Sequence, residues 1–237
     1  MQLHFSQERI FAVMAHPDDA ELLCAGTLAR AKSDGAEIGI CVMCRGDKGL
    51  RAGEVIDNLA EMRQAEATQA AAILGARLFW FGANDAELLD GLPQRRALVE
   101  IYRQFRPTLI IAHFAQDYHP DHRAAAQLAE AASWFCASRG YKTESPALEA
   151  APAVWFADAL NMSGFAPHFF IDVSQQLELK KKMLACHQSQ IRRGGDRDFA
   201  PLTELMLHQA QSRGAEAGVL AAEAFAAHHV FKRARAL

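Results

Sequence analysis

Two clusters of histidine and aspartate each follow an apolar run that is typical of a buried strand. His16-Pro17-Asp18-Asp19 comes directly after the run Ile10–Met14, and His119-Pro120-Asp121-His122 follows the run Leu109–Ala112. Open α/β sheets hold their ligands at the carboxyl ends of the strands. Because catalytic zinc takes His and Asp as ligands, the two clusters predict a metal site at that edge of a sheet.

Three of these side chains can converge on one divalent ion. His16 and Asp19 are three residues apart in a loop that enters a helix, and His122 completes a His-Asp-His set. Zinc with three protein ligands keeps one position for water, whose pKa it lowers toward 7. The same set suits Fe(II) and other divalent ions, so Zn(II) is the expected metal and Fe(II) is an alternative.

Asp18 and His119 then lie beside the expected ion without a ligand role. A carboxylate can take the proton of an attacking water, and a protonated imidazole can stabilise an oxyanion or protonate a leaving amine. We expect Asp121 to hold the His119 ring by a hydrogen bond and to favour its charged form. Asp18, His119 and Asp121 are therefore the predicted catalytic residues of a hydrolase.

Helix capping offers a purely structural explanation for part of the pattern. Aspartate is a favoured N-cap residue, so Asp18 or Asp19 could be structural. Pro120 fits the first turn of a helix, where Asp121 would lie near the positive end of the helix dipole. Capping does not explain the three histidines, and the two clusters together favour the metal site.

The segments AHPDDAEL and HPDHR together resemble motifs of the PIG-L/LmbE family of zinc-dependent N-deacetylases. Members of this family remove acetyl groups from N-acetylglucosamine units in small glycosides and glycolipid head groups. The resemblance covers most of the chain and includes four further segments: Arg45–Gly49, Arg63–Glu66, His187–Gln190 and Ala222–Phe225.

The resemblance implies that three residues bind the metal and that two act in the reaction: His16, Asp19 and His122 as ligands, Asp18 as the general base and His119 as the polarising histidine. Many members read HPDDE, whereas Ala20 separates Asp19 from Glu21 here. Members with one residue inserted at this point include deacetylases of low-molecular-weight thiol biosynthesis. The departure therefore concerns the subfamily and leaves the ligands intact.

Three other segments are weaker candidates for the site. Arg63 and Glu66 are expected to pair with each other or with neighbouring loops. His187 is expected at the rim of the pocket. The arginine-rich stretch 192–197 could bind an anionic part of the substrate, or form a solvated turn or a subunit contact.

Strand-like runs and helical patterns alternate along the chain. We expect six strands: Ile10–Met14, Ile38–Met43, Leu78–Phe81, Leu109–Ala112, Val154–Ala157 and Phe169–Val173. We expect helices at about 21–33, 58–74, 93–105 and 120–138, with further helices up to the C-terminus. This alternation predicts a single Rossmann-like α/β domain over residues 1–237, with helices on both faces of a mostly parallel sheet.

Composition limits the classes of partner. The chain of 237 residues is 51% hydrophobic and has a net charge of -3, without a Lys/Arg stripe, so we expect no nucleic-acid partner. Residues 1–10 lack a signal-peptide core, and no segment reaches roughly 18 unbroken apolar residues, so we expect a cytoplasmic protein without membrane insertion. Five cysteines fit a reducing compartment, and Cys41 and Cys44 are expected on opposite faces of a strand. The family resemblance allows for a homo-oligomer.

The expected reaction is hydrolysis of an N-acetyl amide on a glucosamine-type small molecule, which releases acetate and a free amine. The sequence leaves open whether Asp18 or His119 protonates the amine. It also leaves open the substrate: a thiol-precursor glycoside, an N-acetylglucosamine disaccharide, an inositol conjugate or an antibiotic intermediate. A dinucleotide-dependent oxidoreductase would need a GxGxxG turn in place of the first cluster. A non-catalytic sugar-binding module would not be expected to keep every ligand and proton-transfer group.

Overall fold

The two strands that precede the histidine clusters are neighbours at the centre of one sheet. The computed structural model describes residues 4–50, 53–192 and 201–229. Its seven strands lie in the order β3-β2-β1-β4-β5-β7-β6. Their bounds are β1 Arg9–Met14, β2 Glu37–Cys44, β3 Arg77–Ala83, β4 Leu109–Ala112, β5 Ala153–Ala157, β6 Phe169–Asp172 and β7 Ala222–Ala227. Because β1 to β5 are parallel, their carboxyl ends meet at one edge of the sheet.

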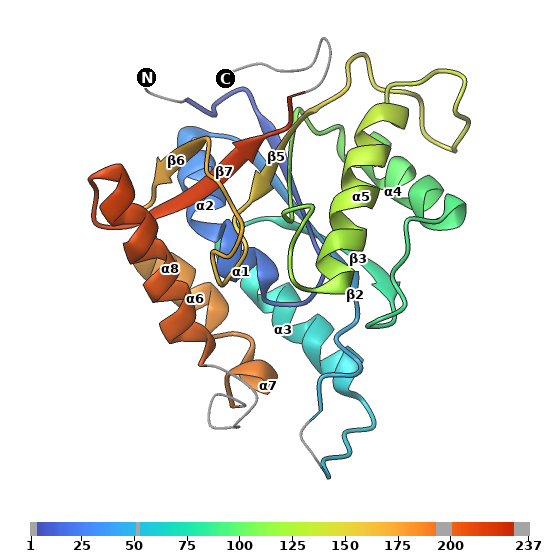
Figure 1. Cartoon of the computed structure of the whole chain (residues 1–237). Coiled ribbons are helices and arrows are strands. Elements are labelled where there is room, and N and C mark those ends of the chain that lie inside the picture. The colour runs from blue at the N-terminus through green and yellow to red at the C-terminus, as the bar shows by residue number, and fades with distance from the viewer. Residues whose placement is uncertain (1–3, 51–52, 193–200, 230–237) are drawn as a thin grey trace.

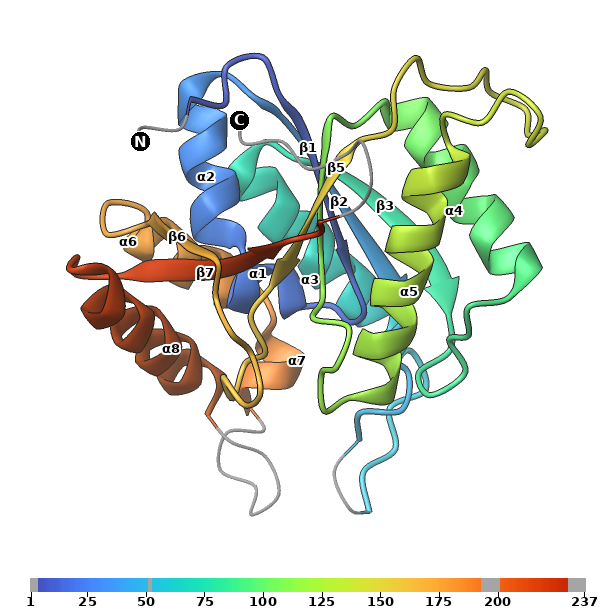
Figure 2. The same cartoon turned by 45° about the horizontal axis from the view of Figure 1, so that its top comes forward.

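Helices cover both faces of this sheet (Figure 1). On one face lie α4 (Leu92–Phe105) and α5 (Pro120–Phe135), as Figure 2 shows. The other helices are α1 Asp19–Leu23, α2 Ala25–Asp34, α3 Leu59–Leu74, α6 Leu177–Leu184, α7 Gln188–Ile191 and α8 Leu202–Ala217. The expected α/β class with helices on both faces is confirmed.

The central strand β1 explains why the sheet needs cover on both sides. Its side chains alternate between two buried cores, so that Ile10 packs with residues of α2 while Phe11 packs with residues of α4 and α5. Parallel strands that are buried on both faces read as continuous apolar runs in the sequence. These apolar runs are why β1 and β4 could be predicted as strands from the sequence.

The expectation of helices up to the C-terminus is wrong at β7. Ala222–Ala227 is rich in alanine, a strong helix former, but it pairs antiparallel with β5 on one side and with β6 on the other. Pairing on both edges overrides the local helix preference, because each strand contact buries backbone and side chains that a surface helix would leave exposed.

The expected helix at 21–33 is divided into α1 and α2 at Cys24, which has a φ of -145°. The backbone N–H groups of Gly26 and Thr27 at the start of α2 donate to the Glu223 carboxylate at 2.9 and 2.7 Å. A carboxylate at the positive end of a helix is stabilising. The break thus depends on a residue almost two hundred positions away.

Cys41 and Cys44 were expected on opposite faces, and this is wrong. The register between β2 and β3 shifts between Val42 and Cys44, and both cysteines lie in the core beneath α4 and α5. Two steps along β2 match three along β3 at this point, because Val42 pairs with Trp80 and Cys44 with Ala83, so the regular alternation ends before Cys44 and does not fix its facing.

Within the described residues, no helix combines the length and the apolar character that crossing a membrane would require.

Candidate metal and catalytic site

A strained turn after β1 carries three of the predicted site residues. Asp18 has a φ of 113°, a backbone conformation that is costly for a non-glycine residue and that concentrates at functional sites. The backbone N–H of His16 donates to Oδ2 of Asp19 at 2.7 Å and closes the turn. Asp18 occupies the N-cap of α1, yet its side chain makes no capping hydrogen bond. Capping therefore does not account for the Asp18 carboxylate.

One carboxylate oxygen of Asp19 lies among three imidazole rings. Asp19 Oδ2 is 3.5 Å from Nδ1 of His16 and 3.4 Å from Nε2 of His122, the two other predicted ligands. It is also 3.2 Å from Nε2 of His113. Burial alone would raise the pKa of Asp19, but His122 and His113 outweigh burial and hold it well below its usual range. The structure thus places an ionised carboxylate between the predicted histidine ligands.

The carboxylate of Asp121 contacts His16, so the expectation that this carboxylate holds the His119 ring is wrong. The backbone N–H of Asp121 contacts that ring instead. Asp121 Oδ2 lies 3.1 Å from Nε2 of His16 and accepts from the backbone N–H of Ala86 at 2.9 Å. Burial opposes the charging of His16, but the hydrogen bonds to Asp121 and Asp19 outweigh it and raise the pKa of His16 to about 10. Asp121 is close to His119 in the sequence. In the folded chain, the turn after β1 brings His16 into contact with the Asp121 carboxylate.

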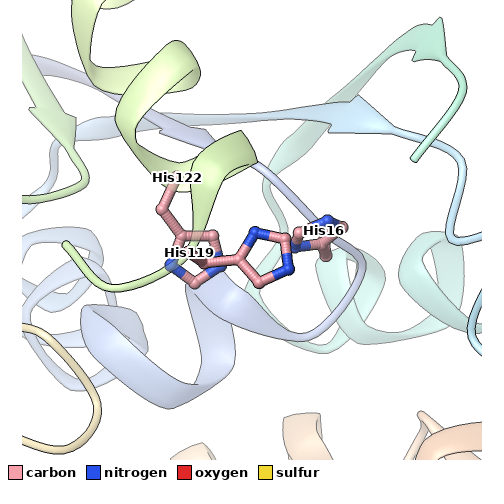
Figure 3. Close-up of side chains that lie close together, drawn as sticks. All are labelled: His16, His119 and His122. Carbon is pink, nitrogen blue, oxygen red and sulfur yellow. The ribbon is translucent and has the colours of Figure 1, made fainter. Parts of the chain in front are cut away.

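His119 is the N-cap of α5, and its ring is fixed by the backbone. Nδ1 of His119 accepts from the N–H of Asp121 at 3.2 Å. Burial, together with the neighbouring His16 and His122, lowers the pKa of His119. Both observations oppose the expected charged form of His119 and favour a neutral ring, with Nε2 as its remaining N–H donor. Figure 3 shows the rings of His16, His119 and His122 gathered at the start of α5 and the turn after β1.

Two residues of this cluster were missed by the sequence analysis. His113 is fully buried directly after β4, stacks on His122 with 4.0 Å between the ring centres, and accepts from the N–H of Ala15 at 2.9 Å. Asp117 Oδ1 lies 3.0 Å from Nδ1 of His122 and accepts from the N–H of His119 at 2.9 Å. Burial lowers the pKa of His113 to about 4. The position of His113 directly after the apolar run Leu109–Ala112 is the sequence signal for it.

A cavity of about 210 Å³ opens over the cluster. Its walls include four kinds of side chain: the imidazoles His16, His119 and His122, the acids Asp18, Asp19 and Asp85, the polar groups Tyr118, Gln190 and Arg63, and apolar residues such as Leu22 and Leu160. Burial, followed by the charge of Asp19, raises the pKa of Asp18 to about 7. A carboxylate with such a pKa can both accept and release a proton near neutral pH.

Arg63 lines the cavity, and Arg63 and Glu66 together contact the loop after β2 and the start of α7. Arg63 is buried and donates to the carbonyl oxygens of Gly46 and Gly49, and Glu66 accepts from the N–H and hydroxyl of Ser189 at 2.8 and 2.7 Å. The predicted contact with neighbouring loops is therefore present.

His187 does not lie at the rim of the pocket, as we had expected. It is fully buried, with Nε2 3.3 Å from Glu21 Oε2. Most of the arginine-rich stretch, residues 193–197, lies outside the described residues.

The donor atoms of the cluster suit a divalent ion. Among the described residues, three overlapping sets have ligand atoms within 4.8 Å of one another: His16, His119 and His122; Asp19, His113 and His122; and His16, Cys44 and Asp121. Imidazole nitrogens combined with one carboxylate are the donors of catalytic zinc sites. Both predicted histidine ligands also have a carboxylate on their second ring nitrogen, which is the usual way to fix a metal-binding imidazole. These residues therefore fit the metal.

A mostly parallel sheet with this cluster at its carboxyl edge defines an α/β protein with a candidate divalent-metal centre. Comparison with known proteins agrees. The PIG-L family, described as GlcNAc-PI de-N-acetylase, matches residues 11–133, more than half of the chain. The chain belongs to the PIG-L family.

Its relatives differ in activity. Diacetylchitobiose deacetylase of Thermococcus kodakarensis is 26% identical over 192 residues, which cover 77% of this chain and 70% of that protein. 4-Oxalmesaconate hydratase of Pseudomonas putida is also 26% identical over 192 residues, covering 78% and 74%. The crystal structure of 4-carboxy-2-hydroxymuconate hydratase from Pseudomonas putida superposes with a TM-score of 0.82 at 24% identity, covering 98% and 99% of the two chains. This structural likeness concerns the fold alone.

Proposed function

We propose that this protein is a metal-dependent N-deacetylase that hydrolyses the acetamide of a neutral N-acetylglucosamine-type small molecule to acetate and a free amine. The observation that carries the proposal is that a general base and an N–H donor, Asp18 and His119, line the same cavity as the ligand cluster. His16, Asp19 and His122 would hold the metal, with Zn(II) expected and Fe(II) as the alternative. A bound divalent ion would supply Lewis-acid polarisation of the acetyl carbonyl.

Asp18 moves the proton in this proposal. Its carboxylate accepts a proton from the water that attacks the acetyl carbon, and the new C–O bond leaves negative charge on the carbonyl oxygen. As the C–N bond breaks, the same proton passes from Asp18 to the departing nitrogen. A pKa of about 7 lets one group perform both transfers, because neither protonation state is strongly favoured.

His119 stabilises the negative oxygen by donating from Nε2. Its Nδ1 is already occupied by the backbone N–H of Asp121, so the ring is held as a neutral donor that needs no reorganisation during the reaction. A neutral imidazole has no second proton to give. This favours Asp18 as the proton source for the amine, a choice that the sequence had left open.

The relatives also suggest a second candidate, hydration of a carboxylate-bearing substrate. Such a substrate would call for cationic side chains in the cavity. Among the lining residues that the structure describes, Arg63 alone is Arg or Lys, and its guanidinium donates to the carbonyls of Gly46 and Gly49 and to Gln190. A neutral amino sugar matches this wall better than a polycarboxylate does.

The experiment compares the two chemistries on one preparation. The purified protein is stripped with a chelator, reloaded with Zn(II) or Fe(II), and assayed for acetate release from N-acetylglucosamine, its methyl glycoside, diacetylchitobiose and an N-acetylglucosaminyl inositol. The same preparation is assayed for loss of ultraviolet absorbance of a conjugated unsaturated dicarboxylate. Metal-dependent acetate release from at least one sugar is expected. Absorbance loss without any acetate release would instead establish the hydratase.

A further inference from the structure

Gln190 is a buried amide whose orientation is fixed by its neighbour. Its side chain lines the cavity and the residue is 8% exposed. Oε1 of Gln190 accepts from Nη2 of Arg63 at 2.7 Å. Because a guanidinium has donors and no acceptor, this contact can only be made by the amide oxygen. The amide NH2 must therefore be the end that is turned away from Arg63.

The partner that sets this orientation cannot easily move. Arg63 is 2% exposed and is held by the carbonyl oxygens of Gly46 and Gly49 in the loop that follows β2. On the other side, Glu66 accepts two hydrogen bonds from Ser189, the residue before Gln190. Helix α3 thus fixes both the side chain of Gln190 and the start of the short helix α7 that carries it.

The Gln190 NH2 group has no acceptor among the residues that the structure describes. The group is not among the buried side-chain atoms that lack a hydrogen-bond partner, so it faces the open cavity, where a ligand can supply its acceptor. The same cavity is lined by two carboxylates, Asp18 and Asp85, and Arg63 is the one Arg or Lys among its described lining residues and is engaged in hydrogen bonds. A neutral amide donor in a cavity with carboxylate acceptors is complementary to a hydroxyl group, which can both accept and donate a hydrogen bond.

We infer that Gln190 is a specificity-determining residue whose NH2 group donates a hydrogen bond to a hydroxyl oxygen of a neutral sugar, and that Arg63 positions it. The inference rests on the proposed function for the class of ligand, but not on turnover. It assigns recognition of the sugar to α7, which contributes Gln190 to the same cavity as the residues that act on the acetyl group. An enzyme that rejects an analogue lacking one hydroxyl gains selectivity because its own donor is then left unpaired.

Two substitutions separate donation to the sugar from the contact with Arg63. Gln190→Glu keeps an oxygen for Arg63 and replaces only the NH2 group, whereas Gln190→Met removes both. Gln188→Met is the matched control, because Gln188 lies on the same helix, is exposed, and donates to the carbonyl of Ala185 at 2.7 Å. The affinity for methyl N-acetylglucosaminide and its 3-, 4- and 6-deoxy analogues is measured by calorimetry on metal-loaded protein. All four proteins carry Asp18→Asn, so that hydrolysis does not interfere.

We expect both Gln190 variants to raise the Kd for the parent sugar by about 3- to 10-fold, the scale of one neutral hydrogen bond, and Gln188→Met to leave it unchanged. The parent protein should bind one of the deoxy analogues with a similarly raised Kd. Substitution of Gln190 should not raise the Kd for that analogue any further. The inference is overturned if Gln190→Glu binds as tightly as the parent, if all analogues respond equally to the substitutions, or if none of the sugars binds. Binding through Gln190 without acetate release by the wild-type enzyme would instead overturn the proposed function and leave this inference standing.

Discussion

This molecule has two groups of buried charged side chains. They differ in whether every polar atom of the group has a hydrogen-bond partner within the protein. In the first, Glu223 of β7 accepts from Lys180 of α6 and from the N–H groups of Gly26 and Thr27. Lys180 is 1% exposed and Glu223 4%. Every charge there has a fixed partner, so the group ties β7, α6 and α2 together and has nothing left to offer a ligand.

The second group is the cluster at the carboxyl edge of the sheet. Three imidazoles crowd one oxygen of Asp19, and buried polar atoms such as Nδ1 of His113 and Oδ2 of Asp117 have no hydrogen-bond partner. A group with surplus donors and acceptors is costly for a folded protein unless something else binds to it. A buried charge group whose polar atoms are all paired within the protein therefore indicates a structural role. A group with unpaired polar atoms indicates a binding or catalytic role.

The largest expected effect comes from removing a ligand. His122→Ala should abolish metal binding and activity together, because it deletes one of three proposed donors and the ring that stacks on His113. Metal content is measured by elemental analysis beside acetate release. Full metal occupancy with normal turnover would remove His122 from the site.

Asp18→Asn should separate catalysis from metal binding. The amide has a similar volume but cannot accept a proton, so kcat should fall by about 10²- to 10⁴-fold while the metal stays bound. Asp90→Asn, at an exposed surface residue, is the control. Loss of metal in proportion to activity would instead make Asp18 a ligand.

His119→Ala should lower kcat by about 10²- to 10³-fold, the scale of losing one oxyanion donor, with metal content unchanged. Because the pKa of His119 is lowered, the ring is already neutral above pH 7, and its deprotonation should not shape the alkaline side of the pH profile. The exposed His208→Ala serves as the control. If His119→Ala removed an alkaline limb that the wild type possesses, the charged form of His119 would be the active one.

Asp121→Asn should act on the metal through His16. Weakening the carboxylate contact to a metal-binding histidine typically costs about 10- to 100-fold in metal affinity, so we expect a loss in this range in competition with a chelator. At saturating metal, kcat should fall less than it does in His119→Ala. A pattern identical to that of His119→Ala would show that Asp121 serves His119 after all.

Lys180→Met should have the smallest effect on activity and a large effect on stability. It leaves the buried Glu223 carboxylate without its cation, which should lower the free energy of unfolding by about 3 to 5 kcal/mol in urea denaturation. The neighbouring Lys181→Met breaks only an exposed pair with Glu178 and should cost at most about 1 kcal/mol. The activity of each folded molecule should be unchanged, and a change in kcat would erase the distinction between the two groups.

The sequence determined the features that depend on local pattern. The runs Ile10–Met14 and Leu109–Ala112 predicted the central strands, because strands that are buried on both faces are continuously apolar. The rule that parallel strands present their carboxyl ends at one edge then brought two distant motifs together. The grouping of His16, Asp19 and His122 follows from this rule.

Tertiary structure decided the pairings within the cluster and the elements held by distant contacts. Asp121 is two residues from His119, yet its carboxylate meets His16 across the turn after β1, because the first turn of α5 directs the Asp121 N–H, and not its side chain, at the His119 ring. The alanine-rich β7 is a strand because β5 and β6 pair with both of its edges. Hydrogen-bond partners and strand pairing depend on which distant segments come into contact in the folded chain. Local residue type and spacing do not specify those contacts.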